Sequence, residues 1–397
     1  MKKLLFGILM AGILITSCQG EYYGTPATYH VLLDSAFLKA GENAGELEKV
    51  LQSVTRKQKE AAAFLIAYMP VNDLQTLSSE FIIDQINGAF RAREEFSWCK
   101  SLPDSVFLNE VLPYFSLDEK RDNWRSDFYN RFAPLVQNCS NMYEAVDSVN
   151  LNIMEVLGVE YNTKRSAVNI SPFQAIEEKM ATCTGLSFLL IDAFRSVGIP
   201  ARIAGTPMWT NMRGNHSWVE VWIDGEWYFT EYYPDALNKS WFLADAGKAD
   251  PQKPVHWIYA ASFKPAETSY PLIWKRNSKD VHAVNVTDRY IRLYQEQLAG
   301  SELNEDELLV DVVLYKDQTE QGAQGRISQK VTVWEGEEQV DFGYTPQPTD
   351  DLNKFLKFRL KKDKTYRFEF ADINGESRSQ EIHTGSAGGD VIKLFVI

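Results

Sequence analysis

Apolar residues recur every three to four positions over the first half of the chain after its leading segment. In "NAGELEKVLQSV", Leu47, Val50 and Leu51 fall on one face of a helix, and "SSEFIIDQINGAF" repeats this spacing. The pattern predicts a helical domain over residues 43–161. Two more helices are expected in "SPFQAIEEKM" and "CTGLSFLLIDAFRSVGIP", the second of which should end at Gly198.

Two of these helix starts carry the spacing of a capping box. Asn43 and Glu46 stand three residues apart, and so do Ser171 and Gln174. Pro172 follows Ser171 at the first helical position, where proline is favoured. We therefore expect Gln174 to cap its own helix rather than to serve a functional site.

The hydrophobic period changes to two after residue 200. "ARIAGTPMW" predicts a strand, and "HSWVEVWIDGEWYFTEYY" predicts a hairpin that turns at Asp224-Gly225. Short alternating runs follow from "LLVDVVLYK" to "DVIKLFVI", separated by Gly, Asn and Asp. They predict a β-sandwich, immunoglobulin-like or prealbumin-like, as an accessory domain over residues 276–397. The fold class is therefore expected to be α+β.

The leading segment has the layout of an export signal. "MKKLLFGILMAGILITSC" places two lysines before an apolar run that is short for a membrane span. Its ending resembles a bacterial lipobox, which implies a signal peptide over residues 1–17, lipidation of Cys18 and a tether over residues 18–42. Gln19 is not the aspartate linked to inner-membrane retention, so the resemblance implies an outer-membrane lipoprotein of the cell envelope, facing the periplasm or the surface.

Charge and cysteine content narrow the class of partner. The 397 residues carry a formal net charge of −13, which argues against nucleic acid as a partner. Of the four cysteines, Cys99 and Cys139 either pair in an oxidising compartment or are two small buried residues. Cys183 has no obvious partner, and an odd cysteine in an exported protein suggests a reactive thiol.

The candidate chemistry gathers around Cys183. A helix N-terminus favours the thiolate form of a cysteine, and Thr182 is placed to be the N-cap of the helix that Cys183 begins. His216 opens a strand after a polar loop, where it can act as a base. Glu231 on the return strand, or alternatively Asp235, can orient the imidazole.

These segments together resemble the transglutaminase-like superfamily, a circularly rearranged relative of papain. The likeness lies in "CTGLSFLL", "RSVGIPAR" and "HSWVEVWIDGEW" and covers about residues 165–265. It implies an α+β catalytic core over residues 162–275, with Cys183 as nucleophile and His216 as base. The family usually has aspartate where Glu231 stands.

The expected activity is that of a thiol enzyme without a cofactor. It would cleave or transfer an amide or acyl group, as a peptidase or amidase acting on a peptide, glycopeptide or peptidoglycan-like substrate. Trp209 and Trp218 would line the substrate groove. The alternative is a binding or scaffold lipoprotein that keeps the fold without turnover. The sequence spacing of cysteine and histidine predicts no metal site, and no GxSxG elbow suggests a serine hydrolase.

Overall fold

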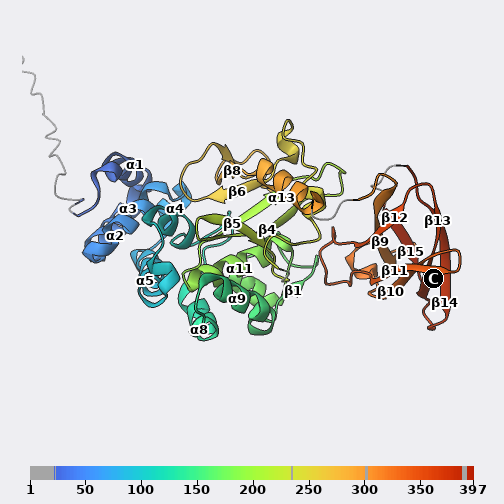
Figure 1. Ribbon diagram of the computed structural model, residues 1–397. Coiled ribbons are helices and arrows are strands. Elements are labelled where there is room, and N and C mark those ends of the chain that lie inside the picture. Colours follow the sequence, from blue (N-terminus) through green and yellow to red (C-terminus); the bar gives the residue numbers. More distant parts are fainter. Residues whose placement is uncertain (1–21, 23, 234–235, 300–302, 387–390) are drawn as a thin grey trace, which may run out of the picture. The chain divides into compact units, whose positions relative to one another are not determined.

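The computed structural model of the chain describes residues 22, 24–233, 236–299, 303–386 and 391–397 (Figure 1). Contacts divide the chain into two compact units, residues 1–83 and residues 84–397. Over the described residues, we find no helix with the length and apolar character needed to cross a membrane.

The first unit is made of helices, which the hydrophobic period predicts from residue 43 onward; helix α1 (His30–Ala40) lies within residues 18–42, the segment expected to be a tether. Leu33, Leu47, Val50 and Leu65 are fully buried and form its interior. Its elements are η1 (Ala27–Tyr29), α1 (His30–Ala40), η2 (Gly41–Asn43), α2 (Ala44–Ser53), η3 (Arg56–Gln58), α3 (Lys59–Tyr68), α4 (Val71–Thr76) and the beginning of α5 (Ser79–Glu95).

The predicted capping box at the start of α2 is wrong. Asn43 precedes the helix, but its side chain makes no capping hydrogen bond and instead donates to the carbonyl oxygens of Leu74 and Leu77, at 2.8 and 2.9 Å. Glu46 accepts from the backbone N–H of Ser79 at 2.8 Å. Both side chains therefore join α2 to the segment around the start of α5, and this tertiary use prevails over local capping.

The second unit begins with helices that surround the long central helix α11. Proline and glycine end several of them; Gly158, for example, closes α9 in the left-handed conformation with φ of 65°. These elements are the rest of α5, then α6 (Ser97–Lys100), α7 (Asp104–Val106), η4 (Phe107–Val111), α8 (Arg125–Val136), α9 (Met142–Leu157), α10 (Pro172–Glu178) and α11 (Cys183–Ser196).

A six-stranded antiparallel sheet forms the other layer of the core, in the order β5-β4-β3-β6-β8-β7. The hairpin prediction is confirmed, because β4 and β5 are joined at Asp224 and Gly225, whose φ values of 51° and 96° suit a two-residue turn. The strands are β3 (Ala201–Thr206), β4 (His216–Ile223), β5 (Glu226–Thr230), β6 (Tyr259–Ser262), β7 (Thr268–Ser269) and β8 (His282–Asn285). A separate parallel pair, β1 (Glu160–Tyr161) and β2 (Met180–Ala181), precedes α11.

Each face of this sheet is covered. Helix α11 packs against β3 and β4 on one face (Figure 1). On the other face, an aromatic cluster that includes Trp218, Phe229, Phe242 and Tyr290 packs beneath α12 (Leu243–Ala246) and α13 (Thr287–Ala299). The short η5 (Pro254–His256) leads into β6. Burial on both faces holds β4 rigidly and so fixes the direction of the side chains at its beginning.

The C-terminal part is a β-sandwich, as predicted. One sheet has the order β11-β10-β13-β14 and the other β12-β9-β15, in which β15 runs parallel to β9. Apolar side chains from both sheets meet between them, Val312, Val333 and Phe368 among them. The elements are β9 (Glu307–Tyr315), η6 (Ala323–Gly325), β10 (Lys330–Glu335), β11 (Glu338–Tyr344), β12 (Leu356–Lys361), β13 (Thr365–Ala371), β14 (Ser377–His383) and β15 (Val391–Phe395).

The core sheet continues beyond the boundary expected at residue 275. Strand β8 pairs with β6 and β7, and Tyr290 and Tyr294 of α13 belong to the aromatic cluster of the core. The segment after residue 280 therefore supplies the last paired strand and a covering helix of the core before the sandwich begins at β9.

Candidate active site

Cys183 is the first residue of α11, with Thr182 as the N-cap residue, as the sequence predicts. Its side chain is partly exposed. The helix start is held close to the segment before it, since a Cβ atom on Gly185 would lie 2.7 Å from Cγ2 of Ile170 and 2.9 Å from Cβ of Ala181. Only glycine permits this approach, and it places the first turn of α11 with its free backbone N–H groups beside the thiol.

His216 is the first residue of β4 and is only 1% exposed. It pairs with Thr206 at the end of β3. The rings of Trp241 and Phe242 lie 4.9 and 5.2 Å from the imidazole, centroid to centroid. This packing restricts the ring to one orientation, so its two nitrogens face fixed partners.

Glu231 follows directly after β5 and contacts one of these nitrogens. Its Oε1 lies 2.8 Å from Nε2 of His216, while its Oε2 accepts a hydrogen bond from the hydroxyl of Ser240. Asn150 donates to the backbone carbonyl of Glu231 at 2.7 Å. The carboxylate is therefore fixed, and it sets the tautomer in which Nε2 carries hydrogen and Nδ1 faces the interior of the site.

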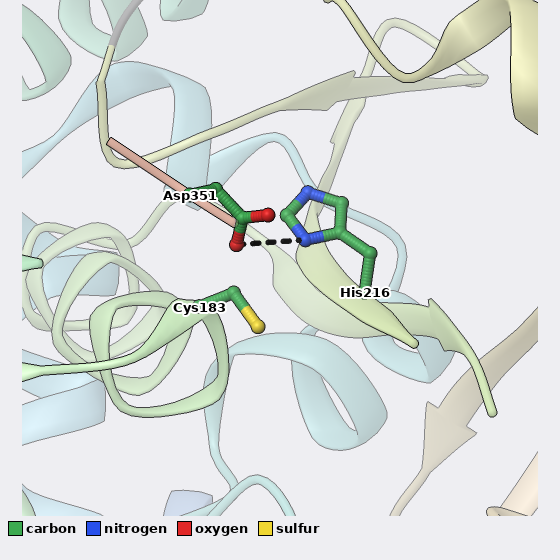
Figure 2. A group of neighbouring side chains, drawn as sticks. All are labelled: Cys183, His216 and Asp351. Carbon is green, nitrogen blue, oxygen red and sulfur yellow. Dashed lines mark ion pairs between the residues drawn. The ribbon is translucent and has the colours of Figure 1, made fainter. Parts of the chain in front are cut away.

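Asp351 occupies the other side of the imidazole, which the sequence analysis missed. Asp351 lies in the loop between β11 and β12 of the sandwich. Its Oδ2 is 3.4 Å from Nδ1 of His216. The ligand-type atoms of Cys183, His216 and Asp351 all lie within 4.8 Å of one another, and Figure 2 shows the three side chains converging. The loop "TPQPTDDLN" has no hydrophobic period or known motif that could have indicated this contact.

Residues 130–232 match the model of the transglutaminase-like superfamily. This segment contains Cys183, His216 and Glu231 and ends one residue after Glu231, so Asp351 lies outside it. The helical N-terminal region, the transglutaminase-like α+β core and the C-terminal β-sheets agree with the predicted fold class. No curated protein gives a significant match to this sequence.

Solved structures of a cysteine protease and a transglutaminase resemble this chain, with low sequence identity. A candidate cysteine protease from Cytophaga hutchinsonii is 19% identical over 48% of this chain and 66% of its own, with a TM-score of 0.28. Red sea bream transglutaminase is 10% identical over 72% and 65% of the two chains, with a TM-score of 0.29. In both cases the match spans less than two thirds of the related protein. The assignment of the core rests on the family match.

Several contacts hold the Asp351 loop against the transglutaminase-like core. The side-chain amide of Asn353 donates to the carbonyl of Asn215 at 2.8 Å, next to His216. The backbone N–H of Asn353 donates to Oδ1 of Asp351 at 2.8 Å, and Arg326 donates to the Asp351 carbonyl at 2.6 Å. Oδ1 is thus occupied within the loop, and Oδ2 is left to face the imidazole.

The His216 imidazolium and the Asp351 carboxylate stabilise each other. Burial lowers the pKa of His216, but the Asp351 carboxylate, with contacts to Cys183 and Glu231, outweighs it and raises this pKa well above the usual value for histidine. Burial likewise raises the pKa of Asp351, and the imidazolium outweighs that effect and lowers it. The arrangement is that of an imidazolium between two carboxylates, beside a thiol.

The space around these groups is small. A cavity of about 30 Å³ is lined by Cys183, His216, Glu231, Asp351 and neighbouring tyrosines, among them Tyr161. One water molecule needs roughly 10–15 Å³ of such volume, so the cavity has room for water. In this arrangement Asp351 of the sandwich loop supplies part of the wall of the cavity.

The substrate-binding residues expected from sequence lie elsewhere. Trp209 and Trp218 are 2% and 0% exposed and stack on each other with ring centroids 6.1 Å apart. The indole N–H of Trp218 donates to the hydroxyl of Tyr290 at 2.6 Å. Both indoles belong to the core beneath the sheet, and neither lines the cavity. Strand alternation places Trp218 on the same face of β4 as His216. After His216, the first residue of the strand, this face is covered by the aromatic cluster beneath α12 and α13.

The remaining expectations from the sequence concern Gln174, the other cysteines and Asp235. Gln174 lies outside the cavity and donates to Ser166 and Glu178 at 2.7 and 3.0 Å, so the predicted capping box with Ser171 is wrong. Cys99 and Cys139 both carry free thiols. Cys18 and Asp235 lie outside the described residues.

Proposed function

We propose that this chain is an exported lipoprotein whose thiol site cleaves or transfers an amide or acyl group, as a peptidase or amidase. The observation that supports it is the placement of His216. Glu231 holds Nε2, and Figure 2 shows that Nδ1, the nitrogen paired with Asp351, lies on the side of the ring toward Cys183 at its helix start. This is the nucleophile, base and orienting acid of a thiol enzyme, in the order of contacts that the chemistry needs.

Glu231 rather than Asp351 is the orienting acid in this proposal. A base needs one nitrogen for the acid and the other for the thiol. Glu231 is at hydrogen-bond distance from Nε2, which points away from Cys183, whereas Asp351 shares the Nδ1 side with the thiol. Asp351 therefore competes with Cys183 for the base.

In the reaction, Cys183 attacks a carbonyl carbon and His216 transfers the proton to the leaving amine. The free N–H groups of the first turn of α11 stabilise the negative oxygen that develops. Water then hydrolyses the acyl-enzyme, or an amine accepts the acyl group. Because Asp351 lies against Nδ1, the nitrogen that serves the thiol, the loop between β11 and β12 would move aside before His216 acts on a bound amide.

The substrate class is an amide of the cell envelope, such as a peptide, glycopeptide or peptidoglycan cross-link. This part of the proposal rests on the sequence signals for export and for lipidation of Cys18, which would place the protein at the outer membrane. A lipid anchor keeps the enzyme near polymers of the envelope.

The test is the rate at which a small alkylating reagent labels Cys183 at neutral pH, followed on its own peptide by mass spectrometry. The wild type is compared with His216→Ala and Glu231→Gln, all three in chelator so that no metal ion occupies the thiol. Labelling of Cys139 in the same sample serves as the internal control. We expect roughly 10-fold or slower labelling of Cys183 in His216→Ala, because the imidazole stabilises the thiolate. A peptide library screen for cleavage follows. Equal labelling in all three proteins would refute the proposed thiol site.

One observation favours a second candidate, a binding or scaffold lipoprotein. The site is closed by a charged residue of the same chain, and such closure suits a fold kept without turnover. Asp351→Ala separates the two proposals, since it removes the competing carboxylate. Turnover of any amide by this variant supports the enzyme, whereas slow labelling of Cys183 together with no turnover supports the scaffold.

A further inference from the structure

The contact between His216 and Asp351 is longer than a charged hydrogen bond. Their Nδ1 and Oδ2 atoms are 3.4 Å apart, whereas N–H···O bonds between charged groups are usually about 2.7–2.9 Å. Two ligands of one tetrahedral zinc ion, each bound at about 2.0 Å, lie roughly 3.3 Å apart. The separation therefore fits a shared cation between the two atoms at least as well as a shared proton.

The third ligand type needed for such an ion is present. The thiol of Cys183 lies within 4.8 Å of the other two ligand atoms, and a thiolate bound at about 2.3 Å would stand roughly 3.5 Å from them. Ligation therefore requires the Cys183 side chain to turn about its Cα–Cβ bond toward the other two ligand atoms. Thiolate, imidazole and carboxylate are the three side-chain groups that zinc prefers, and Figure 2 shows them converging.

The surroundings of the imidazole also suit a metal. Histidine ligands usually donate their other N–H to a carboxylate, which fixes the ring and raises its basicity. Glu231 is that carboxylate here: its Oε1 lies 2.8 Å from Nε2, and the hydroxyl of Ser240 donates to its Oε2. Nδ1 is consequently the nitrogen that ligates the ion after its proton leaves, and it is the one that faces Asp351.

We propose that Cys183, His216 and Asp351 form a site for Zn²⁺ or a similar transition-metal ion, with water as the fourth ligand. The cavity of about 30 Å³ beside them has room for that water. Binding releases two protons to solvent, the thiol proton of Cys183 and the Nδ1 proton of the His216 imidazolium, as both groups ligate the ion. Because Asp351 comes from the sandwich and the other two from the transglutaminase-like core, the ion ties the two parts together and blocks the nucleophile. The proposal goes beyond the proposed function and needs no turnover.

The test uses the full chain, purified in detergent, stripped with a chelator and then freed of it. Zn²⁺ binding is measured by titration calorimetry, and Co²⁺ reports thiolate ligation through its charge-transfer absorption. We expect one Zn²⁺ per chain and slower alkylation of Cys183 by 10-fold or more, reversed by chelator. Cys183→Ser should lose the cobalt charge-transfer band.

Variants separate this site from unspecific binding. Glu231→Gln, which alters the group behind the ligand, should weaken zinc affinity by about 10–100-fold. Asp351→Asn should weaken it at least as much, while Asp363→Asn, an exposed acid in a turn of the same sandwich, serves as the matched control and should leave it unchanged. A thermal melt in chelator checks that each variant folds.

Two outcomes overturn the metal site. One is the absence of stoichiometric Zn²⁺ binding, and the other is binding that Asp351→Asn leaves unchanged. If Cys183 labelling without metal still depends on His216 in either case, the thiol enzyme proposal stands while the metal site falls. If zinc binds as expected but labelling without metal does not depend on His216, the metal site stands and the thiol enzyme proposal falls.

Discussion

Glu110 offers a quantitative test of the electrostatics beneath the core sheet. It lies in η4 and is 6% exposed, and its Oε1 accepts from the side chain of Asn109 at 2.6 Å. None of the described residues hydrogen-bonds to its Oε2. Burial raises the pKa of Glu110 to about 7, although Arg202, Asn109 and Arg195 act in the opposite direction.

The sign of the pH effect follows from the proton count. The folded protein holds the Glu110 proton up to about pH 7, whereas the unfolded chain loses it near 4.5. The stability that this group contributes is therefore full below about pH 4.5 and is lost as the pH rises through about 7. A difference of about 2.5 pKa units corresponds to about 3 kcal/mol.

The perturbation is Glu110→Gln, which keeps the shape and removes the proton equilibrium. Unfolding by denaturant is followed through tryptophan fluorescence, and all ten tryptophans lie in residues 84–397, so the signal reports the second unit alone. Relative to wild type, we expect the variant to gain about 3 kcal/mol between pH 4 and pH 8. A stability difference that stays constant over this range would refute the reasoning, because Arg202 and Arg195 are unchanged in both proteins.

Three further predictions concern the site and its support. Asp351→Asn should speed alkylation of Cys183 in chelator by several-fold, measured by peptide mass spectrometry, since it removes a carboxylate that competes for the base; a slower rate would contradict this role. Trp209→Ala should cost about 3–5 kcal/mol of unfolding free energy by denaturant titration, as for a core tryptophan, whereas a groove residue would lose substrate affinity at unchanged stability. Gly198→Ala should lower the melting temperature measured by circular dichroism, because φ is 75° and the new Cβ would lie 2.6 Å from Cβ of Cys99; an unchanged melting temperature would show that this packing is easily relaxed.

The sequence was most informative where a local rule and burial point the same way. Asp224-Gly225 predicts a tight hairpin, and both residues adopt the positive φ values that such a turn needs. Thr182 and Cys183 were expected at the start of a helix, and they are there because apolar residues from Leu186 onward are buried. These features depend on a few neighbouring residues, so the chain itself encodes them.

Helix α13 was missed although its signal is present in the sequence. The β-sandwich expected over residues 276–397 includes no helix, but Tyr290, Leu293 and Tyr294 have the spacing of one helical face. Those side chains pack on the aromatic cluster of the core. The hydrophobic period changes from helical to alternating within this segment, so a single element type does not describe it.

Asp351 could not be predicted by any local rule, because its role depends on how a loop of the sandwich lies against the beginning of β4. The structure nonetheless makes its chemical consequence clear. Two carboxylates flank one imidazole, and burial makes unneutralised negative charge costly there. A cation between His216 and Asp351 is therefore required in the closed state, either a proton or a metal ion. In the proposed thiol mechanism an amide substrate is neutral and brings no such charge, so the Asp351 carboxylate would have to leave Nδ1 before His216 could serve Cys183. The acid that stabilises the imidazolium would thus be the group that the proposed mechanism displaces.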